Sequence, residues 1–443
     1  MTAGALLARV LSAAGVGATY GVPLAGVPVT EVRGAGVALL LAHAHRSVHG
    51  VPAVAHVGDG VLLVPGHSPQ GGPEPEPPSA VVVVDEGSDL AALAPSLAEA
   101  VRGEGVRVDV RIDASAPVPD GPVALPAPPE GWAEPSDELV AELAQAQRAV
   151  VLAGPGVVEH RAVGGLRALA AVGRLGVLNT WGAKGVFHWQ SRHHWATVGL
   201  QQRDFELGGV PEADLVLAVG VDEREAPPRL WAAPGGAAVC VVAPEALGPL
   251  AERWPRAAGE FVDLPPLRRR LAAVTQAGWA ATGTPLVPSL VTRHYARVLG
   301  EAGLVAADPG TAGYWVARTF ATTRLGSALV PAAPLEGWAA ACVLVARLAA
   351  PLRPALAVVD GPPGGRTESL LVEAARLGVR LGVETWQADG EAPGAEAHLA
   401  RLEGLAAGQG GTATLATDGR QLAEMVEVAG PVRAWTGDEA GSA

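Results

Sequence analysis

The segments AVVLAG (149–154), AVGGLRALAAVGRLG (162–176) and VLNT (177–180) decide the fold class. The first and third are short runs of small and branched residues, which are typical of strands buried in a parallel sheet. The segment between them has the apolar spacing of a helix. Two more strand-like runs follow, ADLVLAVG (213–220) and AAVCVVAP (237–244). Strands that alternate with helices predict a doubly wound parallel sheet.

The same alternation recurs on both sides of this block. Upstream, AVVVVD (80–85), a helix over 88–102 and VRVDVRI (106–112) form a β-α-β unit. Downstream, we predict strands in LVAADPG (304–310), ALAVVDGP (355–362) and ATLAT (413–417), separated by helical segments. A proline-rich stretch over 117–135 and a Gly/Pro stretch over 283–288 separate the blocks. We therefore predict an α/β protein with domains over 1–118, 136–282 and 283–443, and a linker over 119–135.

Two local expectations belong to the middle block. Ser136 precedes Asp137 and Glu138, and its hydroxyl suits the N-cap of a helix whose acidic first turn faces the positive helix end. We also expect a strand over 261–264 to close the block.

Composition limits the function classes. The 443 residues are 49% hydrophobic and 17% charged, with a formal charge of −13. This charge argues against a nucleic-acid partner, because affinity for the phosphate backbone depends mainly on Lys and Arg. No run approaches the roughly 20 apolar residues of a membrane span, and no signal peptide is recognised. We expect a cytoplasmic protein without a membrane partner, in which Cys240 and Cys342 are buried, unbridged side chains.

Between residue 2 and about residue 430, the order of elements resembles the thiamine diphosphate (ThDP) enzymes of the acetolactate synthase and benzoylformate decarboxylase type. Gly21-Val22-Pro23 matches the opening of their pyrimidine-binding domain. The middle block, from AVVLAGPGV through LGVLNTWGAKGVFHWQSRHHWATVGL to EADLVLAVGVDE, is similar to their central domain. LVAADPGTAGYWVAR and ALAVVDGPPGG resemble their diphosphate-binding domain. The resemblance implies three α/β domains, a homodimer or a dimer of dimers, and a small-molecule ligand.

The resemblance also implies residues for ThDP and Mg²⁺. The family holds Mg²⁺ with a strand-end carboxylate and with an amide side chain one helix later, and the metal bridges the diphosphate oxygens. Oxygen ligands of this kind are what Mg²⁺ prefers. The matching metal positions are Asp360 and Thr385. The full set of implied cofactor-binding residues is Asp308, Gly310, Thr311, Asp360, Gly361 and Thr385.

Several positions depart from the family pattern. The family activates ThDP with a glutamate, and that position falls on Ala35, which cannot relay a proton. Glu31 is the nearest carboxylate and the candidate catalytic residue if the alignment shifts; otherwise it is a surface side chain beside Arg33. Val359 replaces the first glycine of a Gly-Asp-Gly triplet, and Thr385 replaces asparagine.

Two functions remain open. The first is a pseudoenzyme that has lost ThDP chemistry and serves as a binding or scaffold protein, or catalyses without the cofactor. The second is an active, ThDP- and Mg²⁺-dependent lyase or transferase acting on 2-oxo acids. Only the second predicts Mg²⁺-dependent binding of ThDP.

Other motifs give weaker signals. Histidines cluster at His43, His45 and His49 and again at His188, His193 and His194. His45 and His49 share a helix face, but the glutamate of a His-Glu-x-x-His zinc motif is missing. Gly154-Pro155-Gly156 follows a strand, yet Glu159 stands where a dinucleotide fingerprint needs its third glycine. We therefore expect neither zinc catalysis nor bound FAD or NAD.

Overall fold

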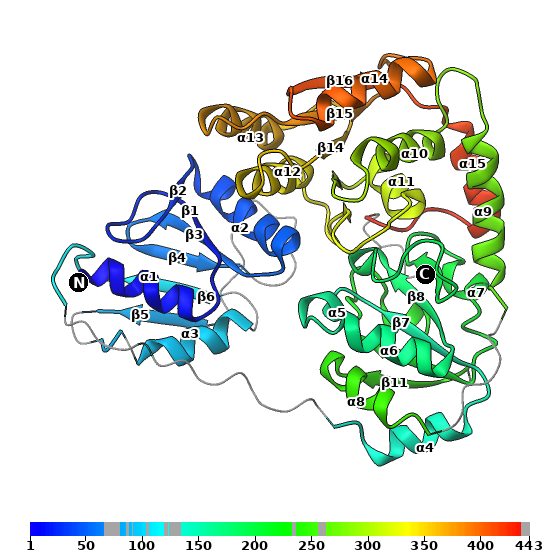
Figure 1. Ribbon diagram of the computed structural model, residues 1–443, viewed down its shortest axis with the longest axis horizontal. Helices are drawn as coiled ribbons and strands as arrows, with labels where there is room; N and C mark the ends of the chain where they lie inside the picture. Colours follow the sequence, from blue (N-terminus) through cyan, green and yellow to red (C-terminus); the bar gives the residue numbers. More distant parts are fainter. Residues whose placement is uncertain are drawn as a thin grey trace, which may run out of the picture. The chain divides into compact units, whose positions relative to one another are not determined.

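A computed structural model describes residues 1–65, 80–85, 88–90, 92–102, 106–118, 123, 134–232, 236–255 and 263–435. Its described part contains three β-sheets with helices packed on them (Figure 1). The predicted α/β fold class is confirmed. The chain divides into two compact units: Met1–Glu130 with Ala333–Arg353 and Pro363–Leu381, and Gly131–Ala332 with Pro354–Pro362 and Gly382–Ala443. Each unit is described by itself.

The first unit contains a six-stranded sheet in the order β2-β1-β3-β4-β6-β5. Its strands are β1 (Ala18–Gly21), β2 (Thr30–Glu31), β3 (Ala53–Gly58), β4 (Val61–Val64), β5 (Ala80–Val84) and β6 (Val106–Val110). The predicted β-α-β unit is present, since β5 and β6 are parallel. The sheet as a whole is mixed, because β4 runs antiparallel to both neighbours. Asp59 and Gly60 connect β3 to β4 with φ of 48° and 71°, the left-handed geometry of a two-residue hairpin turn.

Helices cover both faces of this sheet. Helices α1 (Ala3–Ala13) and α3 (Leu93–Arg102) pack against each other over one core, which includes the buried Leu7, Leu62 and Leu97. Helix α2 (Ala35–His49) packs on β1 and β3, and α12 (Trp338–Ala349) packs on α2. Helix α13 (Gly365–Arg376) lies against α12. The first unit therefore incorporates two helices from the last third of the chain.

The second unit contains two five-stranded sheets that are parallel throughout. The central sheet has the order β11-β10-β7-β8-β9 and the other the order β13-β12-β14-β15-β16. The central strands are β7 (Ala149–Ala153), β8 (Gly176–Thr180), β9 (His194–Val198), β10 (Leu215–Val219) and β11 (Ala238–Val242). The others are β12 (Leu304–Ala307), β13 (Ala328–Leu329), β14 (Ala355–Asp360), β15 (Gly382–Trp386) and β16 (Gly411–Leu415).

Helices bury both faces of the central sheet. One core includes Val151, Leu166 and Leu217, and the opposite core includes Leu152 and Trp195. The helices around this sheet are α4 (Asp137–Gln145), α5 (Gly156–Glu159), α6 (Val163–Gly173), α7 (Asp204–Leu207), α8 (Leu247–Glu252) and α9 (Pro266–Trp279), with short 3-10 turns η1 (Trp181–Ala183), η2 (Pro228–Leu230) and η3 (Pro244–Ala246). The predicted N-cap is confirmed, because the Ser136 hydroxyl accepts a hydrogen bond from the Leu139 N–H.

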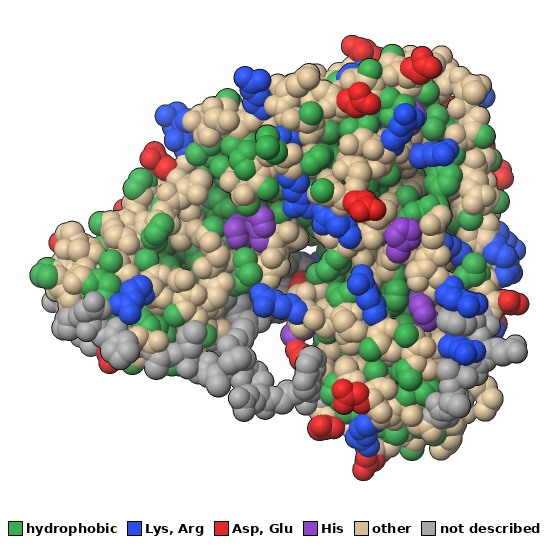
Figure 2. All heavy atoms as spheres, in the orientation of Figure 1, with side chains coloured by type: hydrophobic (Ala, Val, Ile, Leu, Met, Phe, Trp, Pro, Cys, Tyr) green, Lys and Arg blue, Asp and Glu red, His purple; other side chains and the backbone are tan. Residues whose placement is uncertain are grey.

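The helices in the region of the third sheet are α10 (Pro288–Leu299), α11 (Thr311–Thr319), α14 (Ala395–Ala406) and α15 (Arg420–Ala429). Its core contains fully buried aromatic side chains, including Tyr295, Tyr314 and Trp315. The face shown in Figure 2 has acidic, basic and apolar side chains interspersed.

Some expectations fall partly outside the described residues. Only 123, 134 and 135 of the predicted linker are described, and the domain boundaries stay predictions. Of the strand expected over 261–264, only 263 and 264 are described, and they are not in a strand. Cys342 is buried as predicted, whereas Cys240 is only partly buried. Among the described helices, none is long and apolar enough to cross a membrane.

Candidate functional site

Four of the predicted cofactor residues meet at the carboxyl ends of β12 and β14. These strands are parallel neighbours, so the residues that follow them lie at one sheet edge. Asp308 follows β12, is buried, and donates its N–H to the Val358 carbonyl at 2.9 Å. Gly310 precedes α11, and the Thr311 N–H donates to Asp360 Oδ2 at 2.9 Å. The Asp360 carboxylate therefore caps helix α11.

Gly310 is required at this cap for two reasons. Its φ of 123° disfavours any side chain, and an added Cβ would lie 2.3 Å from Asp360 Oδ2. The carboxylate also interacts favourably with the positive N-terminal end of the helix. Gly361 follows with a φ of 78° and donates its N–H to the Trp386 carbonyl at 2.8 Å. These residues lie together at one edge of the sheet, where the Asp360 carboxylate is bonded to the start of α11; their role as cofactor ligands stays a prediction.

The structure does not bring Thr385 to Asp360. Strands β14 and β15 pair with Val359 opposite Thr385 and Asp360 opposite Trp386. Side chains alternate between the two faces of a sheet, and residues opposite each other share a face. Thr385 therefore faces the side opposite to Asp360. Its buried hydroxyl accepts a hydrogen bond from Gln387 Nε2 at 2.8 Å.

Trp386 is the residue that lies opposite Asp360 in the pairing of β14 with β15. An indole N–H is a donor and cannot ligate a cation, and here it donates to the Tyr295 hydroxyl at 2.8 Å. Mg²⁺ needs several oxygen ligands in near-octahedral geometry. No group of three or more His, Cys, Asp or Glu side chains within the described ranges could hold a metal ion. Because Thr385 faces away from Asp360, this pair of side chains does not provide the two oxygen ligands expected for the Mg²⁺ that would anchor a diphosphate.

The first unit places the catalytic candidates at the surface. Ala35 is the first residue of α2 and is exposed, so a methyl group occupies the position expected for the activating glutamate. Glu31 is the exposed last residue of β2, and its backbone carbonyl accepts a hydrogen bond from the Arg376 guanidinium. Glu31 is thus separated from the start of α2 by the turn over 32–34.

The first histidine cluster belongs to the packing of α2. The rings of His45 and His49 lie 4.6 Å apart, and His45 Nδ1 is 2.9 Å from the Tyr20 hydroxyl. Burial and the nearby His49 lower the pKa of His45 to about 4, so this ring is neutral at neutral pH. His43, two residues earlier, is buried. His45 and His49 are thus partly buried side chains that contact each other on one face of α2.

The second histidine cluster is divided among different environments. His188 is exposed, and His193 Nδ1 bonds the Leu175 carbonyl at 2.9 Å. His194 begins β9, where burial and the charges of Arg268 and Lys184 hold its pKa well below the usual range. Packing and hydrogen bonding account for this cluster.

Gly154 and Gly156 allow two backbone segments to pack closely against each other. A Cβ on Gly154 would lie 2.2 Å from the Gly220 carbonyl oxygen, and one on Gly156 would lie 2.7 Å from the Gly220 Cα. The Gly156 N–H donates to that same carbonyl at 2.9 Å. The loops after β7 and β10 therefore touch at the point where the strand order reverses, the usual position of a ligand in such sheets.

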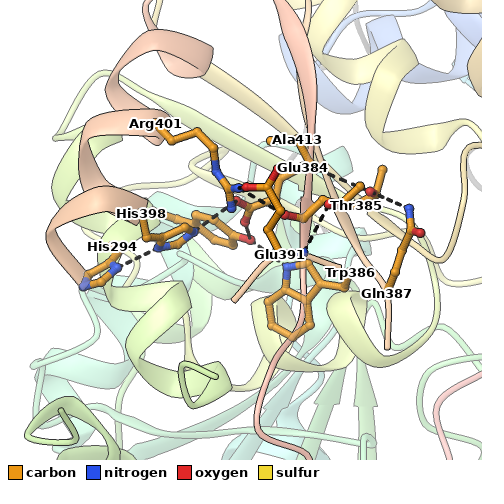
Figure 3. A network of polar contacts seen from close by, with 11 residues as sticks. His294, Glu384, Thr385, Trp386, Gln387, Glu391, His398, Arg401 and Ala413 are labelled. Carbon is orange, nitrogen blue, oxygen red and sulfur yellow. Dashed lines mark hydrogen bonds and ion pairs between the residues drawn. The ribbon is translucent and has the colours of Figure 1, made fainter. Parts of the chain in front are cut away.

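A buried network of polar side chains around Glu384 was not predicted from the sequence. Glu384 on β15 is fully buried, and three side chains from two helices donate to its carboxylate (Figure 3). The Tyr295 hydroxyl lies 2.5 Å from Oε2, and His398 Nε2 lies 3.0 Å from Oε1. Arg401 reaches Oε1 at 3.2 Å. The sequence offered only the Glu384-Thr385-Trp386 triplet, whose partners are distant in the chain.

The network extends beyond the carboxylate to a second histidine. His294 Nδ1 on α10 lies 2.8 Å from His398 Nδ1 on α14, so the two rings share one proton between them. Burial alone would raise the pKa of Glu384, but the bond and charge of His398, together with Tyr295 and Arg401, bring it below its usual value. The carboxylate is therefore ionised and paired at neutral pH.

His294 should make the stability of the protein sensitive to mild acid. Burial, together with the charges of His398, Arg297 and Arg293, lowers the pKa of His294 to about 4 against the opposing charge of Glu384. The unfolded chain binds this proton near pH 6.5, whereas the folded chain does not. The free energy of unfolding is therefore highest above about pH 6.5. It falls by an amount on the order of 2 kcal/mol as the pH decreases toward 4.

Urea unfolding at several pH values between 4 and 7 measures this dependence. His294→Gln should flatten it, because the titrating ring is removed. His188→Gln, a change at an exposed histidine, should leave the dependence of the unfolding free energy on pH as it is in the wild type. If the unfolding free energy depended on pH equally in the wild type and in His294→Gln, the prediction would be contradicted.

Residues 136–242 match the family model described as thiamine pyrophosphate enzyme, central domain. The match covers the whole central sheet, so this region is similar to the central domain of thiamine pyrophosphate enzymes. No curated protein matches the chain.

Proposed function

We propose that this protein keeps the fold of a ThDP enzyme without ThDP catalysis, and acts as a binding or scaffold protein or as a catalyst that does not use the cofactor. The pairing of Asp360 with Trp386 carries the proposal, because it turns Thr385, the other predicted metal ligand, to the opposite face of the sheet. Ala35 adds to it, since the expected proton-relaying carboxylate is missing there. The central-domain match accounts for the fold and does not require activity.

Calorimetric titration of ThDP with Mg²⁺ into the purified protein tests this proposal. We expect no heat of binding and no rise in melting temperature at millimolar ThDP, because a ligand stabilises a fold only when it binds the folded state. Asp360→Ala is the matched control, and a known ThDP enzyme shows that the reagents are competent. Micromolar binding that is lost in Asp360→Ala would establish the alternative, an acetolactate synthase-like lyase or transferase acting on 2-oxo acids.

The assembly and location are proposed from the resemblance and the composition. The family resemblance supports a homodimer or a dimer of dimers, and closed symmetric assemblies are common among soluble proteins. The negative charge of −13 supports the absence of a nucleic-acid partner. A cytoplasmic location is proposed on the same composition.

A further inference from the structure

We infer that Lys184 is a reactive amine that binds small anionic carbonyl compounds as an imine. The inference rests on the proposed function, because it names the class of ligand that a binding protein or a cofactor-independent catalyst of this fold would take. Its evidence lies in the second unit near Arg318, at the end of α11, whereas Asp360 caps the start of that helix.

Lys184 is the single lysine of the chain. Lys and Arg together number 32 among the 443 residues, and every other one is an arginine. The Lys184 side chain is only 7% exposed, although lysine is among the residue types least often buried. A chain that otherwise uses arginine for its positive charges therefore places its one side-chain amine in the interior.

The turn that carries Lys184 is held on both sides. The Lys184 N–H donates to the Trp181 carbonyl at 3.1 Å and so closes the short turn η1 that follows β8. Gly185 comes next with a φ of 94°, and an added Cβ there would lie 2.6 Å from the Arg324 carbonyl oxygen. The backbone around the lysine is therefore closely packed against a distant segment of the same unit.

Positive charges surround the Lys184 amine. The charges of Arg318 on α11 and Arg268 on α9 act on it, and Lys184 in turn acts on His194 at the start of β9. Arg318 is already paired with Asp204 at 2.8 Å. Within the described part of the chain, no acidic side chain forms an ion pair with Lys184. A buried amine without an acidic partner points to a ligand, because buried charges are normally paired.

Arg268 is the cation that can meet an anionic group of that ligand. Its guanidinium donates to the Trp189 carbonyl, which is a neutral acceptor. No acidic side chain among the described residues forms an ion pair with Arg268. A guanidinium has five N–H donors, so it can bind a carboxylate or a phosphate while it keeps the bond to Trp189. We therefore expect the carbonyl compound to carry a negative charge.

The surroundings of Lys184 favour its neutral, nucleophilic form. Burial, together with the charges of Arg318 and Arg268, lowers the pKa of Lys184 to about 7. The neutral nitrogen attacks the carbonyl carbon, and the carbonyl oxygen leaves as water with the two amine hydrogens as the C=N bond forms. Desolvation and a neighbouring cation are known ways to activate a lysine for this reaction.

Reductive labelling with glyoxylate and cyanoborohydride tests the inference. The hydride reagent traps an imine as a stable secondary amine, and peptide mass spectrometry locates it. Arg270→Lys is the matched control, because it adds an exposed lysine on α9, close in sequence to Arg268. At pH 7 Lys184 should be labelled at least about tenfold faster than the added amine, because an exposed lysine with a pKa of about 10.4 is almost wholly protonated there.

Two comparisons within the same experiment sharpen the test. The ratio of labelling at Lys184 to labelling at the added amine should fall as the pH rises from 7 to 9, because only the added amine continues to gain its neutral form. Glycolaldehyde has a similar size but no charge. The preference for glyoxylate over glycolaldehyde should be greater at Lys184 than at the added amine.

Lys184→Met distinguishes a reactive lysine from a structural one. We expect this variant to melt at the wild-type temperature or above it, because a buried charge without an acidic partner is removed. A clearly lower melting temperature would assign Lys184 to the stability of the fold and overturn the inference. Labelling of Lys184 no faster than the added amine, or an equal preference for the two aldehydes at both amines, would also overturn it. These labelling results do not depend on whether Lys184→Met folds.

The outcomes separate this inference from the proposed function. If the wild type binds ThDP with Mg²⁺ and Lys184 is still labelled rapidly and selectively, the proposed function fails and the amine site stands. If ThDP does not bind and Lys184 is labelled no faster than the added amine, the amine site fails and the proposed function stands.

Discussion

Replacing Arg318 with methionine should destabilise the second unit by about 3–5 kcal/mol, the range seen when one partner of a buried ion pair is removed. Arg318 on α11 and Asp204 on α7 have side chains that are 1% and 0% exposed. The guanidinium Nη2 lies 2.8 Å from each oxygen of the carboxylate. Methionine would leave Asp204 buried without its cation.

The pair has further bonds that would also be lost or strained. Arg318 Nη1 donates to the Thr197 carbonyl at 2.7 Å, and the Asp204 carboxylate accepts from the Leu200 and Gln201 N–H groups at 2.9 and 3.0 Å. These contacts join the segment between β9 and β10 of the central sheet to α11, which packs on β14 of the third sheet. Their loss should therefore lower the unfolding midpoint of both sheets together.

Urea unfolding followed by fluorescence and circular dichroism measures the effect. Arg203→Met is the matched control, because Arg203 precedes the same short helix and forms an exposed pair with Glu206; its effect should stay within about 1 kcal/mol. The double variant Arg318→Met with Asp204→Leu should recover part of the loss, since no buried charge is left unpaired. A midpoint for Arg318→Met equal to that of Arg203→Met would disprove the role of the pair.

Removal of the Glu384 carboxylate should have a comparable effect, about 3–5 kcal/mol for Glu384→Ala. Three donors would lose their acceptor at once: the Tyr295 hydroxyl, His398 Nε2 and Arg401. Each donor left unsatisfied in the interior costs about 1–3 kcal/mol, and a charged one costs more. Glu384→Gln should lower the free energy of unfolding by less, because its carbonyl oxygen can still accept a hydrogen bond.

The neighbouring Glu391 provides the control for this network. Its carboxylate also contacts Arg401, at 3.1 Å, but its side chain is 74% exposed. Glu391→Gln should change stability by less than about 1 kcal/mol. Chemical denaturation of the three variants gives the comparison, and a Glu384→Ala variant as stable as Glu391→Gln would show that the network contributes little.

Local sequence determined the secondary structure of much of the chain. The branched runs in β7 and β10 and the serine before α4 act through neighbours a few residues away, so a reader of the sequence can place them. The hairpin at Asp59-Gly60 has an equally local cause. The antiparallel direction of β4 follows from the left-handed geometry of both residues.

The candidate site could be predicted only in part. Asp308, Gly310, Thr311 and Asp360 come directly after or near the ends of two neighbouring parallel strands, so strand order alone brings them together. Thr385 lies within a strand, where a shift of one residue moves every side chain to the other face. The pairing of β14 with β15 decided that Trp386, rather than Thr385, lies beside Asp360.

The sequence by itself determined the α/β class, the positions of the main strands and the absence of a carboxyl group at Ala35. Tertiary structure alone decided the hydrogen-bond partners of Glu384 and Arg318 described above, which lie between 14 and 121 positions away. The physical reason is the distance along the sequence over which each effect acts. Backbone preferences and caps depend on adjacent residues, whereas a buried charge is stabilised by whichever group packing brings next to it.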